Sequence, residues 1–328
     1  MNFAEFQQSQ ERILRERESV LDCAETNLYR ALARLSPPAT PPPSTTIHRC
    51  HLATEWVACF GFAHETARRA LVSCGVRDSL AILFQHYAGA NSRLWLPRDN
   101  YPVYAELARS AGLTTSEFPT LNEIVWPDAK PANAAEILLL TNPLKPAGCW
   151  LNSRDVQQLE AWLAQDARRR LLLDAVYTFG TEFHPTTLRL LKTRQAILLH
   201  SVTKGWLHPR LFGVALVPEA DFATLAPVFR AKPPPQPNLS RARELLTQHR
   251  ATPAAVATAL ACAREKFAAA MPQTIQLPQS GDAPGYFFPV DAPWQILLDR
   301  HGILGLPASV FGSQREDITI LSSLKFAA

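Results

Sequence analysis

Three short apolar runs in the middle of the chain each end at polar residues. They read EILLL at 136–140, LLL at 171–173 and AILL at 196–199. Continuous apolar runs of this length are typical of strands buried on both faces of a parallel sheet. RLWL at 93–96 and GVALV at 213–217 fit two further strands. Segments of helical character separate these strands, and this alternation predicts an α/β fold with a doubly wound, mostly parallel sheet.

The segments between and around the strands carry the spacing and end signals of helices. Residues 2–35 place their apolar side chains roughly on one stripe, which predicts an N-terminal helix. Further helices are predicted at about 65–72, 79–87, 104–111, 152–167 and 240–270.

Two proline-rich stretches divide the chain. SPPATPPPS at 36–44 and PPPQP at 233–237 are stiff and cannot continue a helix or a strand. We therefore expect an N-terminal helix and arm at 1–48, a large domain with the mostly parallel sheet at 49–232, and a small α+β domain at 233–328.

The composition is ordinary for a globular enzyme: 328 residues, 47% hydrophobic and 19% charged. The net charge of +4 is spread along the chain, so we expect no nucleic-acid partner, and the arginine clusters at 12–17 and 168–170 are expected to be solvated helix faces. No apolar stretch has transmembrane length, so no membrane partner is expected. The six cysteines form no CxxC pair, which favours no metal site, and without a signal-peptide core a reducing cytoplasmic location is expected.

Chemically useful side chains follow the three apolar runs: Asn142, Asp174, Tyr177, Ser201 and Lys204. In open α/β sheets the ligand binds outside the carboxyl ends of the strands, so these side chains should converge on one crevice. Together they match the needs of pyridoxal phosphate. An amine forms a Schiff base with its aldehyde, a carboxylate keeps its ring nitrogen protonated, a phenol and an amide bond its phenolic oxygen, and a hydroxyl helps to hold its phosphate.

Short motifs in the same region resemble those of a known family. TNPLKPAG at 141–148 is similar to an Asn-Pro-x-x-Pro-x-Gly loop, DAVY at 174–177 to Asp-x-x-Tyr, and SVTK at 201–204 to Ser-x-x-Lys. Each motif is short, but their order and separations from about residue 75 to residue 213 resemble the fold type I pyridoxal phosphate enzymes, in particular the class I/II aminotransferases. The resemblance implies a large domain with a small C-terminal domain, and a homodimer.

The resemblance also implies roles for the reacting residues. Lys204 is implied to form the Schiff base and to move the proton at the substrate Cα. Asp174 is implied to pair with the ring nitrogen, and Tyr177 and Asn142 to bond the phenolic oxygen.

Other residues are implied to hold the rest of the cofactor. Ser201 and Arg210 are implied to bind the phosphate, together with the backbone at Val76 and Arg77. Tyr101 is implied to stack on the ring.

The C-terminal region departs from the family pattern. In the family, an arginine that clamps the substrate carboxylate stands just before a short apolar-Ser run. In this chain Ile320 stands at the position of that arginine. Arg315 is one candidate substitute. An altered clamp suggests an unusual substrate, as in specialised biosynthesis.

The function expected from these residues is a pyridoxal phosphate-dependent aminotransferase that acts on an amino acid or related amine. The same scaffold supports decarboxylases, lyases and amino-acid cyclases, so a non-transaminating enzyme is the main alternative. A catalytically silent binding protein is a third possibility, against which the presence of both Lys204 and Asp174 counts. A serine acyl-enzyme would need Ser-Asp-Asn and Lys-Thr-Gly motifs that the chain lacks.

Overall fold

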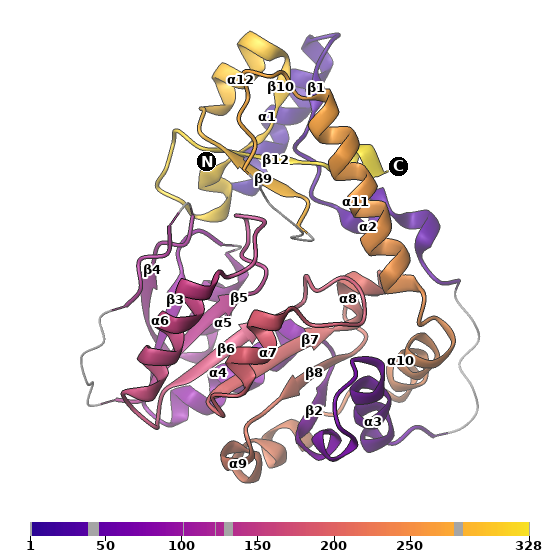
Figure 1. Cartoon of the computed structure of the whole chain (residues 1–328), viewed down its shortest axis with the longest axis vertical. Coiled ribbons are helices and arrows are strands. Elements are labelled where there is room, and N and C mark those ends of the chain that lie inside the picture. The colour runs from indigo at the N-terminus through magenta and orange to yellow at the C-terminus, as the bar shows by residue number, and fades with distance from the viewer. Residues whose placement is uncertain are drawn as a thin grey trace.

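The centre of the fold is a seven-stranded sheet (Figure 1). The computed structural model describes residues 2–38, 46–100, 102–121, 123–127, 134–278 and 285–327. The strands stand in the order β2-β8-β7-β6-β5-β3-β4, and of these seven β8 alone runs in the opposite direction to the others. Their bounds are β2 (Ala70–Ser73), β3 (Arg93–Pro97), β4 (Thr114–Phe118), β5 (Glu136–Thr141), β6 (Arg170–Asp174), β7 (Ala196–Ser201) and β8 (Gly213–Leu216). The predicted mostly parallel α/β sheet is confirmed.

The three central strands end at one edge of this sheet. Thr141 of β5 stands opposite Asp174 of β6, which in turn stands opposite Leu199 of β7. Every residue of β5 and β7 is buried, as the uninterrupted apolar runs predicted. The register therefore brings the polar residues that follow these runs to the same edge.

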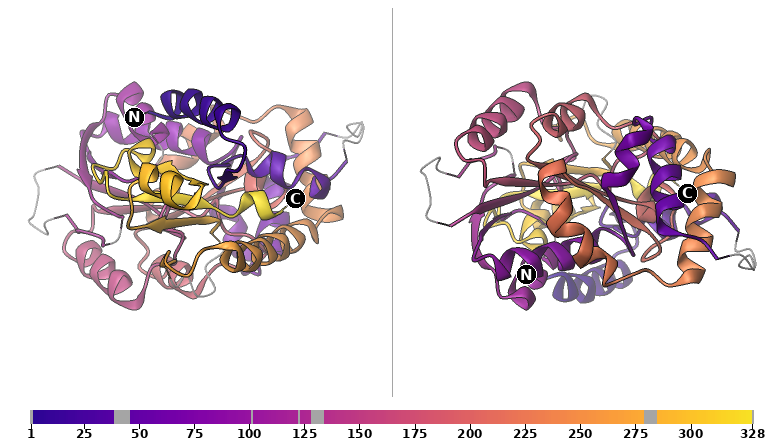
Figure 2. Two further views of the ribbon diagram at one scale, coloured as in Figure 1. Left: turned by 90° about the horizontal axis from the view of Figure 1, so that it is seen from above. Right: turned by 90° about the horizontal axis from the view of Figure 1, so that it is seen from below.

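Helices cover both faces of the sheet (Figure 2). One face packs against α3 (Arg49–Cys59), α6 (Ser153–Ala164), α7 (Pro185–Leu191) and α10 (Gln236–Gln248). The other packs against α4 (Val76–Gly89), α5 (Val103–Ala111) and α9 (Glu219–Arg230).

The two ends of the chain build a second lobe above the carboxyl edge of the sheet (Figure 1). Its antiparallel sheet has the order β11 (Leu306–Pro307), β12 (Thr319–Ser322), β9 (Phe287–Val290). N-terminal β1 (Leu21–Asp22) pairs in parallel with C-terminal β10 (Ile303–Leu304). The remaining helices are α1 (Phe3–Glu16), α2 (Leu28–Ala31), α8 (Val202–Gly205), α11 (Thr252–Ala270) and α12 (Trp294–His301), with 3-10 turns at Ala33–Leu35, His64–Arg69, Ala308–Phe311 and Leu324–Ala327.

One apolar cluster joins the two ends of the chain. It contains Phe6 and Leu28 from the N-terminal segment, Leu260 from α11, and Ile320 from β12. The predicted boundaries at 48/49 and 232/233 stay predictions. Among the described residues, every helix is too short or too polar to cross a membrane.

Three helix predictions were wrong in extent. The N-terminal helix ends at Glu16, because the chain turns extended and pairs with β10, a partner about 280 residues away that local spacing cannot reveal. The segment at 65–72 is a 3-10 turn that leads into β2. The helix expected at 240–270 is divided into α10 and α11, and Pro253 stands in the first turn of α11, where proline is tolerated.

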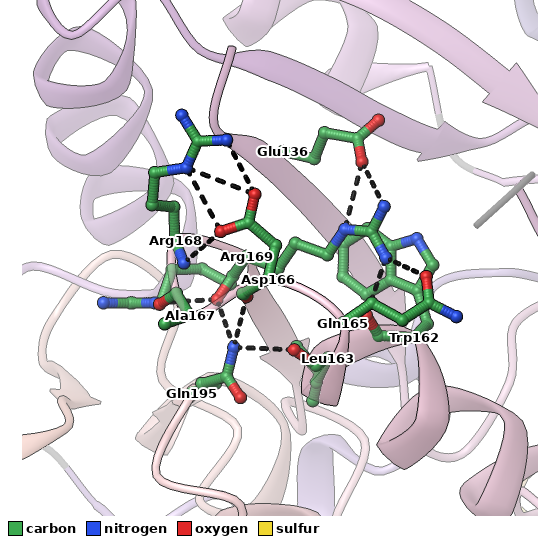
Figure 3. Close-up of polar contacts among 10 residues, drawn as sticks. Glu136, Trp162, Leu163, Gln165, Asp166, Ala167, Arg168, Arg169 and Gln195 are labelled. Atoms are coloured by element: carbon green, nitrogen blue, oxygen red, sulfur yellow. Dashed lines mark hydrogen bonds and ion pairs between the residues drawn. The ribbon is translucent and has the colours of Figure 1, made fainter. Parts of the chain in front are cut away.

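The arginine cluster at 168–170 is only partly solvated, contrary to the prediction (Figure 3). The Arg169 side chain is 1% exposed, and its guanidinium lies 2.8 Å from a carboxylate oxygen of Glu136, also buried. Arg169 also donates to the Trp162 carbonyl (2.7 Å) and to the Gln165 side chain (2.8 Å). Of the three, only Arg168 is solvated, with a side chain 54% exposed, and it lies in the turn after α6 and not on a helix face. The buried pair connects the start of β5 to the chain just before β6.

We predict that Arg169→Met destabilises the protein by about 3–5 kcal/mol, because it leaves the Glu136 carboxylate buried without its cation. The free energy of unfolding in urea measures this change. Arg168→Met is the matched control and should leave the urea midpoint nearly unchanged, since its ion pair is solvated. Equal urea midpoints for the two variants would contradict the buried role of Arg169.

Candidate active site

A cavity of about 890 Å³ lies at the carboxyl edge of the sheet, beneath the second lobe. Three parts of the chain line it. The sheet domain contributes Val76, Arg77, Tyr104, Lys145, Asp174, Tyr177, Ser201, Lys204 and Arg210; the N-terminal segment contributes Tyr29 and Arg30; the C-terminal segment contributes Phe287, Val310 and Phe311. This is the place where open α/β sheets bind ligands.

Asp174 is the carboxylate of this cavity. It is the last residue of β6 and only 3% exposed. One of its oxygens accepts a 2.6 Å hydrogen bond from the Tyr104 hydroxyl, and the other accepts from the backbone of Val176 at 2.9 Å. Burial nevertheless raises the pKa of Asp174, against these bonds and the nearby lysines. A cationic ligand would therefore favour its ionised form.

Lys204 is the amine that the sequence singled out, and it lines the same cavity. It lies in α8, the single turn that follows β7, and the Ser201 side chain caps this turn by accepting from the Thr203 backbone at 3.3 Å. The Lys204 Nζ lies 5.3 Å from the centroid of the Tyr177 ring and 4.9 Å from that of Tyr29. Burial lowers the pKa of Lys204, which favours the neutral, nucleophilic amine.

The start of α4 lines one corner of the cavity, where its N–H groups could hold an anion. Gly75 precedes this helix with φ of +143°, and Val76 and Arg77 begin it. A Cβ on Gly213 would lie 2.6 Å from the Gly75 Cα, so only glycine lets β8 approach this turn. The first N–H groups of a helix have no helical acceptor and attract anions. Ser201 and Arg210 line the cavity as well.

Asn142 is not placed as the sequence suggested, because it does not line the cavity. It is fully buried, and its amide donates to the hydroxyls of Thr186 (3.0 Å) and Thr187 (2.8 Å). Its side-chain oxygen accepts from the Leu151 backbone at 3.1 Å. Asn142 therefore connects the loop after β5 to α7 by hydrogen bonds.

Lys145, three residues further along the same loop, enters the cavity instead. Its amine donates to the Tyr177 hydroxyl and lies 4.4 Å from the centroid of that ring. Burial lowers the pKa of Lys145 to about 8. Sequence reasoning missed this residue because it stands at an unspecified position of the Asn-Pro-x-x-Pro-x-Gly pattern. A lysine directly before the second proline was the available signal.

Of two further predicted residues, Tyr101 and Arg315, the structure describes only the second. Tyr101 lies outside the described residues. Arg315 is exposed and pairs with Asp317 at 2.7 Å, and it does not line the cavity. Ile320 is buried at the centre of β12. The expected substitution of Arg315 for the missing arginine therefore has no support in this geometry.

Comparison with known proteins agrees with this arrangement. The family described as "Aminotransferase class I and II" matches residues 45–277, more than half of the chain. The chain belongs to this family of enzymes. Class I and II aminotransferases generally use pyridoxal phosphate.

The individual proteins that match the chain are only distantly similar to it in sequence. A histidinol-phosphate aminotransferase of Paramagnetospirillum magneticum is 30% identical over 115 residues, which span 34% of this chain and only 31% of the relative. An aspartate aminotransferase double mutant of Thermus thermophilus superposes with a TM-score of 0.66 at 19% identity, over 99% of this chain and 94% of that one. A probable N-succinyldiaminopimelate aminotransferase of Thermus thermophilus gives 0.71 at 18% identity, over 99% and 98%. These structural similarities show that the chain has the aspartate-aminotransferase-like fold.

The residues around the cavity fit pyridoxal phosphate. The pKa of the buried Asp174 carboxylate is raised despite the two nearby lysines, so a protonated ring nitrogen beside it would stabilise its ionised form. An amine with a lowered pKa faces the same space, and the start of α4 offers N–H groups to an anion.

We predict that Asn142→Ala lowers the free energy of unfolding by about 1–3 kcal/mol, because the variant leaves the Leu151 N–H and the two threonine hydroxyls without this partner. Urea unfolding of the cofactor-free protein measures the loss. Titration with pyridoxal phosphate should give an affinity close to that of the wild type. A large loss of affinity with unchanged stability would show that Asn142 binds the cofactor directly.

Proposed function

We propose that this family member is a pyridoxal phosphate-dependent aminotransferase that acts on an amino acid or a related amine. One observation carries the proposal: Lys204 and Asp174 line the same cavity, and Tyr177 lies beside the lysine. The cofactor is a small ring with an aldehyde and a basic nitrogen, so it needs an amine and a carboxylate in one enclosed space.

When bound, the cofactor supplies an aldehyde that captures amines and a ring that accepts electrons from a bond at the substrate Cα. Asp174 would hold the proton on the ring nitrogen. Lys204 would hold the cofactor at its aldehyde and would move the proton at the substrate Cα. The start of α4, Ser201 and Arg210 would hold the phosphate.

The substrate side of the cavity supports a second candidate, a decarboxylase, lyase or amino-acid cyclase on the same scaffold. Ile320 is buried in β12 and Arg315 pairs with Asp317 away from the cavity, so neither supplies the family's carboxylate clamp. The clamp decides which Cα bond is aligned for cleavage. An altered clamp is compatible with a different reaction and with a substrate from specialised biosynthesis.

Two further elements belong to the proposal. The family resemblance supports a homodimer. All six cysteines are free, which is consistent with a reducing cytoplasmic location.

A half-reaction separates the two candidate functions. The enzyme loaded with pyridoxal phosphate is incubated with a panel of amino donors and no keto acid, and the products are separated by chromatography. An aminotransferase gives aminated cofactor and keto product in equal amounts. Turnover of the donor without aminated cofactor would instead support the second candidate.

Lys204→Met should slow the half-reaction by at least about 100-fold, because it removes both the attaching amine and the proton carrier. Lys266→Met, on the exposed face of α11, is the matched control and should react at the wild-type rate. Wild-type rates in both variants would contradict the proposal.

A further inference from the structure

The loop that joins α8 to β8 has an unusual backbone. Leu207 and Arg210 both have left-handed φ angles, of 58° and 56°, which residues other than glycine rarely adopt. Such residues persist only where their surroundings hold them, and they are frequent at functional sites. The loop lies between Lys204 and Gly213, and Arg210 lines the cavity. The shape of this loop therefore sets the position of Arg210 in the cavity.

Helix α10 binds the loop along its length. The Trp206 indole donates to the Leu245 carbonyl at 3.1 Å, near the start of the loop. The Asn238 side chain donates to the Arg210 carbonyl at 3.2 Å, further along the loop. Between these two contacts, His208 bonds a side chain of the same helix. The left-handed residues are thus held from α10.

The partner of His208 is Arg241, whose Nη2 lies 3.1 Å from the His208 Nε2. A guanidinium only donates, so this ring nitrogen accepts and the imidazole is neutral. The other ring nitrogen then carries the proton, and the imidazole has a second hydrogen bond, with the Pro37 backbone. The pKa of His208 is lowered, first by burial and then by the Arg241 charge, which favours this accepting form.

Arg241 is held in place independently of His208. It pairs with Glu244 at 2.6 Å, and its side chain is 13% exposed. It also donates to the backbone carbonyls of Pro37 (3.0 Å) and Pro38 (2.7 Å) in the N-terminal arm. Because these contacts already order the arginine, its bond to His208 costs little further side-chain entropy and gives the loop a firm attachment.

We propose that His208 is a positioning residue for the cofactor phosphate: by accepting from Arg241 it holds the left-handed loop that presents Arg210 to that phosphate. This inference rests on the proposed function, in which Arg210 binds the phosphate together with Ser201 and the start of α4. Loss of the His208 bond lets the backbone relax at Leu207 and Arg210. The guanidinium then leaves the phosphate, while the rest of the cavity keeps its shape.

The test compares two ligands that differ only in the phosphate group, pyridoxal phosphate and pyridoxal. Each is titrated into the cofactor-free protein, and its dissociation constant is read from tryptophan fluorescence. His208→Leu and His208→Ala should bind pyridoxal phosphate about tenfold more weakly, because the charge-assisted hydrogen bonds of Arg210 are weakened. Their affinity for pyridoxal should stay at the wild-type value, which a general loss of packing would not allow.

Further variants test whether His208 acts through Arg210. His208→Gln restores an acceptor for Arg241 and should retain the wild-type affinity for both ligands. Arg210→Met should lose affinity for pyridoxal phosphate alone, and the double variant with His208→Leu should lose no more than Arg210→Met does, because both changes remove one interaction. His301→Leu, at the exposed end of α12, is the matched control and should bind both ligands normally.

Circular dichroism checks that each variant is folded. An unchanged affinity for pyridoxal phosphate in His208→Leu and His208→Ala, equal losses for both ligands, or additive losses in the double variant would overturn the proposal. These results would leave the proposed function intact. Failure of the wild type to bind pyridoxal phosphate would instead contradict the proposed function, and this inference with it.

Discussion

The buried carboxylate of Asp174 is the constraint around which this site is organised. It stands at the end of β6 at 3% exposure, and its two protein hydrogen bonds do not offset the cost of burial, which raises its pKa. The register of β5, β6 and β7 places the amine of Lys204 at the same edge of the sheet. A carboxylate and two amines that line one cavity suit a ligand that carries both a cation and an aldehyde.

The cavity depends on the two ends of the chain as much as on the sheet. The N-terminal segment and the C-terminal strands share one apolar cluster and pair through β1 and β10. Their side chains form the upper wall, including Tyr29 and Phe311, and Gly148 brings the loop of Lys145 against the same lobe. The packing of the two chain ends, away from the Asp174 carboxylate, therefore determines the shape of the cavity on its substrate side.

The sheet and most of the site could be predicted because they depend on local signals. Buried parallel strands give uninterrupted apolar runs, so the runs at 136–140, 171–173 and 196–199 located both the strands and the polar residues after them. Strand β4 reads TTSEF and gives no such signal, because it lies at the sheet edge and is mostly exposed or half-buried. The roles of Asn142 and Lys145 depend on which way each side chain points from a loop, and a motif of spaced residues does not encode that direction.

The central claim is that Lys204, and not Lys145, is the amine that joins the cofactor. Reduction of the wild-type enzyme with borohydride in the presence of pyridoxal phosphate, followed by peptide mapping, tests it most directly. The account predicts one modified peptide per chain, with the cofactor attached at Lys204. Attachment at Lys145, or at exposed lysines in proportion to their accessibility, would contradict it.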